Sequence, residues 1–102
     1  MEKITSLAKK LQHSASGIPH LANFTLREGE VFSWNHTACA ITYNPDDPEA
    51  VAHLLHEYGH AALNHSTYHR DIDLLRMERE AWGAAVALAA TYHIALDEQI
   101  IG

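Results

Sequence analysis

The sequence has little of what marks several classes of protein. It contains one cysteine, Cys39, so no disulfide can form within the chain, and a reducing compartment such as the cytoplasm is expected. Lysine and arginine number 7 against 13 aspartates and glutamates, for a net charge of −6. Because contacts between cationic side chains and phosphates dominate nucleic-acid affinity, this balance argues against direct binding of nucleic acid.

Long apolar runs are also missing. No stretch without a formal charge is longer than residues 81–96, which are rich in alanine and fall short of the roughly 20 apolar residues that a membrane span needs. The first residues, MEKITSLAKKLQHSASG, spread charges among apolar side chains and therefore do not resemble a secretory signal. No repeat, linker or low-complexity segment divides the 102 residues. We expect one domain over residues 1–102, cytoplasmic and not associated with a membrane.

Periodicity predicts an α+β fold. Residues 3–14 carry apolar side chains at helical spacing before a break at 14–19, which indicates an N-terminal amphipathic helix. In residues 21–43 the period falls towards two, which predicts two or three short strands with turns near Glu28-Gly29 and Asn35-His36. We interpret this region as a small antiparallel sheet.

Two longer helices are predicted in the second half. Asp46 or Asp47 can cap the first, with Pro48 at its first position, and that helix is expected to run to about residue 63 or 64. Asp71 can cap the second, which is expected to reach about His93 before a short final turn, LDEQII.

The chemistry lies in the stretch HLLHEYGHAALNH, residues 53–65. His56, Glu57 and His60 form the pattern H-E-x-x-H on a helix that is otherwise mostly apolar. Residues four apart share one helix face, so both imidazoles can reach one ion, and Glu57 lies beside them, able to polarise a bound water. The alternative is a coincidental pair of helix histidines, or, for nine histidines in a short chain, a metal buffer.

A catalytic zinc usually has three protein ligands and one open position. A metzincin would supply glycine at position 63 and histidine at position 66, but the chain has Leu63 and Ser66, with His65 one place early, so that class is rejected. Glu78 and Glu80 on the following helix are the acidic candidates, about 200° apart on a helical wheel.

Glu80 is the favoured third ligand because it begins a stripe that continues through Ala84, Ala87 and Leu88, with Glu78 held in reserve. Either glutamate could instead be an ordinary solvated carboxylate.

These residues resemble a known family. HLLHEYGHAALNH, followed about twenty residues later by EREAWGAAVALA, is similar to the ImmA/IrrE metallopeptidases, as is the upstream ACAITYNPDDPEAVAHLL. Trp82 and Ala85 depart from the Asn and Phe usual there, and no helix-turn-helix or sensory domain is present. The resemblance implies a zincin-like fold with zinc on His56, His60 and Glu80 and with Glu57 as general base.

The resemblance also implies a cytoplasmic protease that cuts a protein substrate such as a phage or mobile-element repressor of the helix-turn-helix type. The competing hypothesis is a zinc-binding interaction or regulatory module without hydrolytic activity. The sequence leaves the oligomeric state open.

Several other residues have an ordinary and a functional interpretation. Tyr68, His65 and His69 could stabilise an oxyanion but are more typical of a surface, and His53 could support a ligand or lie on the helix surface. Cys39 is expected to be a small buried apolar side chain. The strand around ACAITYN could receive a substrate at its edge or could lie inside the sheet.

Overall fold

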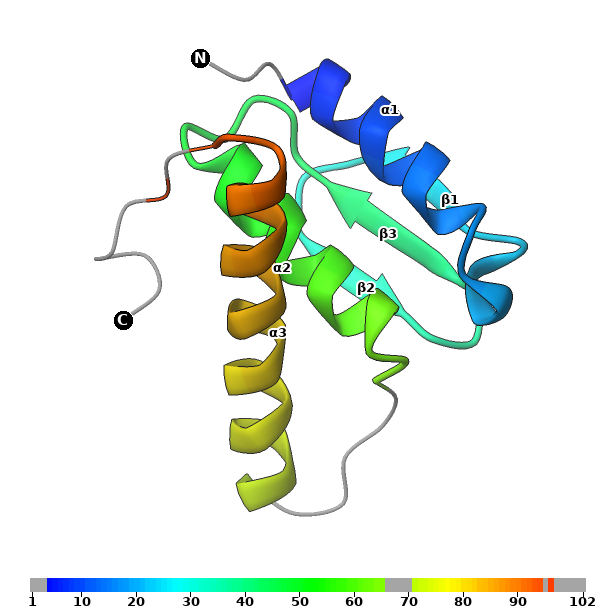
Figure 1. Ribbon diagram of the computed structural model, residues 1–102, viewed down its shortest axis with the longest axis vertical. Helices are drawn as coiled ribbons and strands as arrows, with labels where there is room; N and C mark the ends of the chain where they lie inside the picture. The colour runs from blue at the N-terminus through cyan, green and yellow to red at the C-terminus, as the bar shows by residue number, and fades with distance from the viewer. Residues whose placement is uncertain (1–3, 66–70, 95, 97–102) are drawn as a thin grey trace.

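The computed structural model describes residues 4–65, 71–94 and 96, which form an α+β fold, as predicted. In chain order the elements are α1 (Ile4–Ala15), a 3-10 turn η1 (Pro19–Leu21), β1 (Thr25–Glu28), β2 (Ser33–Asn35), β3 (Ala40–Tyr43), α2 (Ala50–Ala62) and α3 (Asp71–Thr91) (Figure 1). The connection STYHR and most of the predicted final turn lie outside the described residues, as does any capping by the Asp71 side chain.

The N-terminal helix confirms the periodicity prediction. Leu7, Leu11 and Ala15 of α1 are fully buried, and they recur four residues apart, so they line one face of the helix. Tyr58 of α2 donates a hydrogen bond from its hydroxyl to Ser14 Oγ at 3.1 Å. This bond and the shared apolar core join α1 to the helix that carries the histidines.

The two faces of the sheet differ in polarity. Leu26, Ile41 and Trp34 are paired in register, so they lie in one row on one face, and Ile41 at the centre is fully buried. The row of Arg27, Thr42 and Ser33 lies on the other face, since successive side chains of a strand alternate. The apolar row belongs to the hydrophobic core or packs against it.

The prediction of an antiparallel sheet is wrong in part. The strand order is β1-β3-β2, with β3 parallel to β1 and antiparallel to β2, so the sheet is mixed. The turn at residues 36–39 joins β2 to β3 as expected. The turn predicted near Glu28-Gly29 lies just after that pair, as a bend at Glu30 and Val31, because Gly29 N–H donates to the Tyr43 carbonyl at 2.8 Å and prolongs the pairing of β1 with β3.

Gly29 is explained by a close approach. A Cβ on this residue would lie 2.7 Å from Thr42 Cγ2 of the neighbouring strand. Such a contact is well inside van der Waals distance, so a larger residue here would force the Thr42 side chain to move.

The helix that carries the motif begins two residues later than predicted. Asp47 does not cap it; its Oδ1 accepts a hydrogen bond from Glu49 N–H at 2.7 Å, and its carbonyl accepts from Ala50 N–H at 3.0 Å. Asp46 donates its N–H to Asn44 Oδ1 in the preceding turn. The sequence NPDDPE therefore builds a turn ahead of α2, and the helix itself starts at Ala50.

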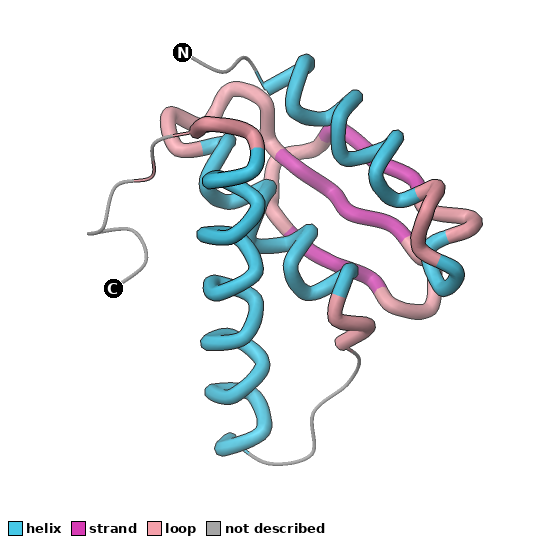
Figure 2. The backbone as a smooth tube through the Cα atoms, in the orientation of Figure 1, coloured by secondary structure: helices cyan, strands magenta, loops and turns pink. Residues whose placement is uncertain are grey.

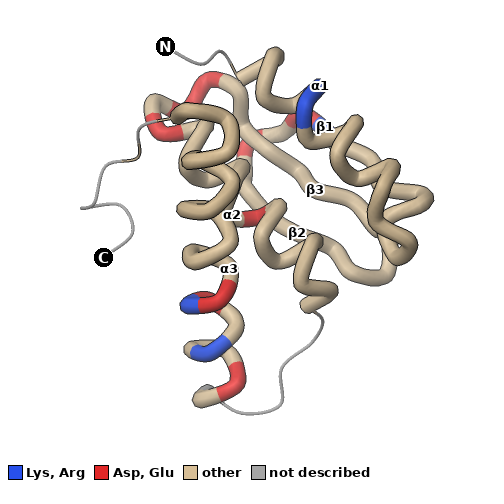
Figure 3. The backbone as a smooth tube through the Cα atoms, viewed as in Figure 1, with Lys and Arg blue, Asp and Glu red and all other residues tan. Residues whose placement is uncertain are grey.

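The helix α2 occupies the middle of the molecule. It contacts β2, β3 and α1, and α3 packs across it, as Figure 2 shows. Leu54, Leu55 and Tyr58 of α2 are fully buried. Charged residues of α3 are confined to its first half, residues 71–80, while residues 81–91 carry none (Figure 3).

Candidate metal centre

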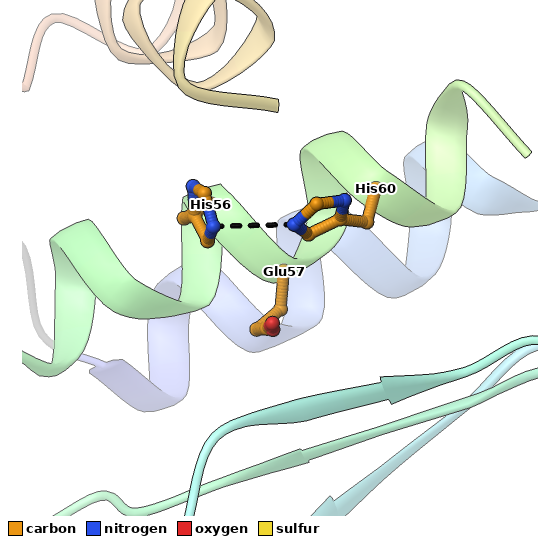
Figure 4. Close-up of side chains that lie close together, drawn as sticks. All are labelled: His56, Glu57 and His60. Atoms are coloured by element: carbon orange, nitrogen blue, oxygen red, sulfur yellow. Dashed lines mark hydrogen bonds between the residues drawn. The ribbon is translucent and has the colours of Figure 1, made fainter. Parts of the chain in front are cut away.

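The H-E-x-x-H helix presents its three functional side chains on two sides. His56 and His60 point together from one side of α2, and Glu57 points toward the strands (Figure 4). One ligand atom of each of these residues lies within 4.8 Å of the others, so they form a group that could hold a metal ion. The i, i+4 spacing of the histidines gives the contact that the sequence predicts, with Nε2 atoms 3.2 Å apart.

Glu78 of α3 completes the group. Its Oε2 lies 2.9 Å from His56 Nε2, and its Oε1 lies 3.0 Å from His60 Nε2. Each histidine is only 8% exposed, whereas the Glu78 side chain is 44% exposed. Two imidazoles and one carboxylate therefore converge at the surface of the hydrophobic core, and the side of the carboxylate is open to solvent.

The donor set fits a zinc ion. Zinc takes imidazole nitrogen and carboxylate oxygen at about 2.0–2.2 Å, which places neighbouring ligand atoms of a tetrahedral site roughly 3.3 Å apart. The three separations observed here lie between 2.9 and 3.2 Å. Small side-chain adjustments are enough to open that space, so the residues present suit one ion.

The two glutamates of α3 do not lie where the sequence analysis expected. Glu80, the favoured ligand, has its Oε1 3.6 Å from His65 Nε2 and 3.7 Å from Arg76 Nε, and Glu78, the reserve, lies against His56 and His60. The placement favours Glu78 over Glu80 as third ligand.

The buried face of α3 explains this placement. That face is formed by Ala81, Ala85 and Ala89, whereas Ala84, Ala87 and Leu88 of the stripe used for prediction are partly or fully exposed. Glu78 precedes Ala81 by three residues and Ala85 by seven, so it continues the buried face toward the histidines.

Gly59 sets the distance between the two helices. A Cβ at this position would lie 2.5 Å from the Ala81 carbonyl oxygen and 3.1 Å from Ala81 Cα. The backbones of α2 and α3 therefore touch inside the motif itself, between His56 and His60. This close contact brings Glu78 within reach of both rings.

Trp82 covers His56 on the α3 side. The two ring centroids are 4.2 Å apart with an interplanar angle of 37°. Trp82 is one of the departures from the family pattern, and here its indole shields an imidazole from water. His56 Nδ1 is buried and has no hydrogen-bond partner among the described residues.

Burial changes the protonation of the site. The pKa of Glu57 is raised to about 7, first by desolvation and then by the negative charge of Glu78. Its Oε2 is buried without a hydrogen-bond partner among the described residues. Desolvation lowers the pKa of His56 and of His60, although the Glu78 carboxylate opposes both shifts. The neutral imidazole, which is the form that binds a metal, is therefore favoured.

A pocket of about 290 Å³ opens beside Glu57. Its apolar lining comes from β2 with the residue before it and from α3, namely Phe32, Trp34, Leu74 and Met77. The strand at this pocket is β2, which lies at an edge of the sheet, whereas β3, the strand of ACAITYN, is paired on both sides. The interpretation of ACAITYN as a receiving edge is therefore wrong, and of the two edge strands, β1 and β2, it is β2 that lies at the pocket.

The remaining candidates separate clearly. His53 lies 3.5 Å from Glu49 and packs its ring near Phe32, and Cys39 packs against the core with its Sγ 3.7 Å from the His20 carbonyl. Tyr68 and His69 lie outside the described residues.

The sequence favours a surface position for His65, but its side chain is largely buried beside His60. Its Nδ1 is 2.9 Å from His60 Nδ1. A signal for this contact was available in the sequence, because Asn64 is one of the residue types that can end a helix in the left-handed conformation and turn the next residue back.

Comparison of the chain with protein-family models, with curated proteins and with solved structures finds no significant match. Among the described residues, no helix combines the length and hydrophobicity of a membrane span. Evidence for function therefore comes from the geometry of the site.

Proposed function

We propose that this chain is a zinc-dependent endopeptidase of the zincin-like type, with zinc on His56, His60 and Glu78 and with Glu57 as general base. The observation that carries the proposal is the convergence of two imidazole nitrogens and one carboxylate, 2.9–3.2 Å apart, beside a buried glutamate. It replaces Glu80 by Glu78 in the ligand set that the resemblance to ImmA/IrrE metallopeptidases implies.

The protein residues supply the proton transfer. A zinc ion held by this donor set would act as a Lewis acid and lower the pKa of a bound water. Glu57 would take the proton of that water and deliver it to the leaving amine. In the metal-free protein, burial and the charge of Glu78 raise the pKa of Glu57 to about 7. A zinc ion nearby would lower that pKa and favour the carboxylate, which is the form that accepts the proton.

The pocket suggests which peptides are suitable. Phe32, Trp34, Leu74 and Met77 line it with apolar surface directly beside Glu57. An extended peptide that hydrogen-bonds to the free edge of β2 would place a side chain there. We therefore expect cleavage next to a large apolar residue.

The biological substrate follows from the resemblance alone. We propose a cytoplasmic protein target, such as a helix-turn-helix repressor of a phage or mobile element. A repressor-like protein encoded beside this chain is the substrate to test first.

The decisive experiment compares wild-type protein with Glu57→Gln. Both should bind one zinc per chain, because Glu57 is not a proposed ligand, whereas cleavage of the repressor or of a peptide library with apolar residues should fall by at least about 100-fold. Metal chelation is the control for metal dependence. Equal cleavage by both proteins would refute the assignment of Glu57.

The same pair of proteins tests the other hypotheses. A zinc-binding regulatory module would show a biological effect that Glu57→Gln leaves intact. A histidine-rich metal buffer would bind several ions per chain with similar affinity. Either result would refute the peptidase hypothesis.

A further inference from the structure

His65 lies directly behind one of the proposed ligands. Its ring centroid is 5.1 Å from that of His60, and the two Nδ1 atoms are 2.9 Å apart. The His65 side chain is only 11% exposed, although the residue follows the end of α2. A histidine in this place contacts the ring nitrogen of His60 that faces away from Glu78.

The C-terminal cap of α2 places His65 there. Asn64 adopts φ 58°, its N–H donates to the Ala61 carbonyl, and His65 N–H donates to the His60 carbonyl at 2.9 Å. This pair of bonds is a Schellman motif, which brings the residue after the left-handed one back over the last turn of the helix. The Trp34 indole N–H also donates to the His65 carbonyl at 2.9 Å. The backbone of His65 is therefore held independently of its side chain.

We propose that His65 is a positioning residue for the metal site, linking Glu80 to His60. This inference rests on the proposed function, since it assumes that His60 Nε2 binds the ion. A nitrogen that binds a metal carries no proton, so His60 Nδ1 must carry it and donate to His65 Nδ1. The proton of His65 then sits on Nε2, which faces Glu80 Oε1 at 3.6 Å.

The chain of three groups has one consistent direction. His65 Nδ1 accepts from His60, the proton on His65 Nε2 faces the Glu80 carboxylate in an electrostatic contact at 3.6 Å, and His60 directs its free nitrogen toward Glu78 and His56. Glu80 is itself 3.7 Å from Arg76. His56 lacks such support, because its Nδ1 has no hydrogen-bond partner among the described residues. The orientation of His60 should therefore contribute strongly to affinity for the ion.

The test measures zinc affinity by chelator competition for wild type, His65→Leu and His65→Gln. His65→Leu removes the acceptor and should weaken zinc binding by about 10–100-fold, the usual effect of losing an outer partner of a metal ligand. Glutamine keeps an oxygen acceptor and should restore most of the affinity. His53→Leu, which removes a histidine of α2 that lies against Glu49, is the control and should bind as wild type does.

Glu80→Ala supplies a second, independent arm. Acting through His65, it should weaken zinc binding less than His65→Leu does and should have no further effect in the His65→Leu background. If Glu80 bound zinc directly, Glu80→Ala would instead weaken zinc binding far more, both in wild type and in the His65→Leu background. That second result would overturn the positioning role of Glu80.

The proton arrangement gives a readout that a merely structural role would not change. In zinc-loaded protein labelled with ¹⁵N histidine, NMR should find the His60 proton on Nδ1 and the His65 proton on Nε2. The opposite arrangement, or equal zinc affinity of wild type and His65→Leu, would refute the proposal while leaving the zinc site in place. Failure of wild type to bind zinc would refute the proposed function itself.

Discussion

Replacing Gly59 by alanine should separate α2 from α3. The added Cβ would lie 2.5 Å from the Ala81 carbonyl oxygen, and ordinary contact begins at 3.4 Å, so the helices must move apart by 0.9 Å (3.4 − 2.5) along this line. Overpacking of this kind typically costs about 1–3 kcal/mol. Alanine is the better helix former by about 1 kcal/mol, which offsets part of this cost.

Gly83→Ala is the matched control on the neighbouring helix. Among the described residues, and apart from the backbone of its own helix, no atom lies within 4 Å of a Cβ at Gly83, so this variant keeps the gain in helix propensity without a clash. The two variants should therefore differ in free energy of unfolding by about 1–3 kcal/mol, with Gly83→Ala the more stable.

Urea unfolding of both variants and wild type, in chelator, measures these differences directly. Zinc affinity should fall in Gly59→Ala, because Glu78 moves with α3, and should be unchanged in Gly83→Ala. If Gly59→Ala proved as stable as Gly83→Ala, the close helix contact would be refuted.

Three further predictions concern the protonation of Glu57, the cap of α2 and the bond between α1 and α2. The folded pKa of Glu57, about 7, exceeds its ordinary 4.5, so the protonated form is favoured by folding, and its contribution to stability is present below 4.5 and lost as pH rises through 7. The free energy of unfolding of metal-free Glu57→Gln, relative to wild type, should therefore rise by about 2–3 kcal/mol as the pH increases from about 5 to about 8 in urea unfolding. The contributions of His56 and His60 cancel in this difference. A difference that does not change with pH would contradict the raised pKa. Asn64→Gly should keep the stability of wild type within about 0.5 kcal/mol, whereas Asn64→Val should lose about 1–2 kcal/mol, because valine resists positive φ; equal melting of the two would exclude the left-handed cap. Tyr58→Phe removes the bond to Ser14 and should cost about 0.5–1.5 kcal/mol in the same assay, and an unchanged midpoint would show that the bond contributes nothing.

The helices were predictable because their signals are local. The spacing of Leu7 and Leu11 identifies α1, and the motif with its apolar surroundings identifies α2. The order of the strands was not predictable from the sequence. A hairpin between β1 and β2 and the insertion of β3 between these two strands require the same alternation of side chains.

The choice between Glu78 and Glu80 illustrates the same limit. The helix α3 is rich in alanine on several faces, so its pattern does not single out the buried one. The contact of Gly59 with Ala81 decides which face is buried, and it joins residues on two different helices. Periodicity within one segment contains no information about that contact.

The central claim is that Glu78, with His56 and His60, binds one zinc ion. Equilibrium zinc affinity of wild type, Glu78→Gln and Glu80→Gln, measured by chelator competition, tests it most directly. We predict one zinc per wild-type chain, a loss in Glu78→Gln beyond the about 100-fold that removal of an outer partner costs, and a much smaller loss in Glu80→Gln. A wild-type chain that binds no zinc, or a site that survives Glu78→Gln and is lost in Glu80→Gln, would contradict the claim.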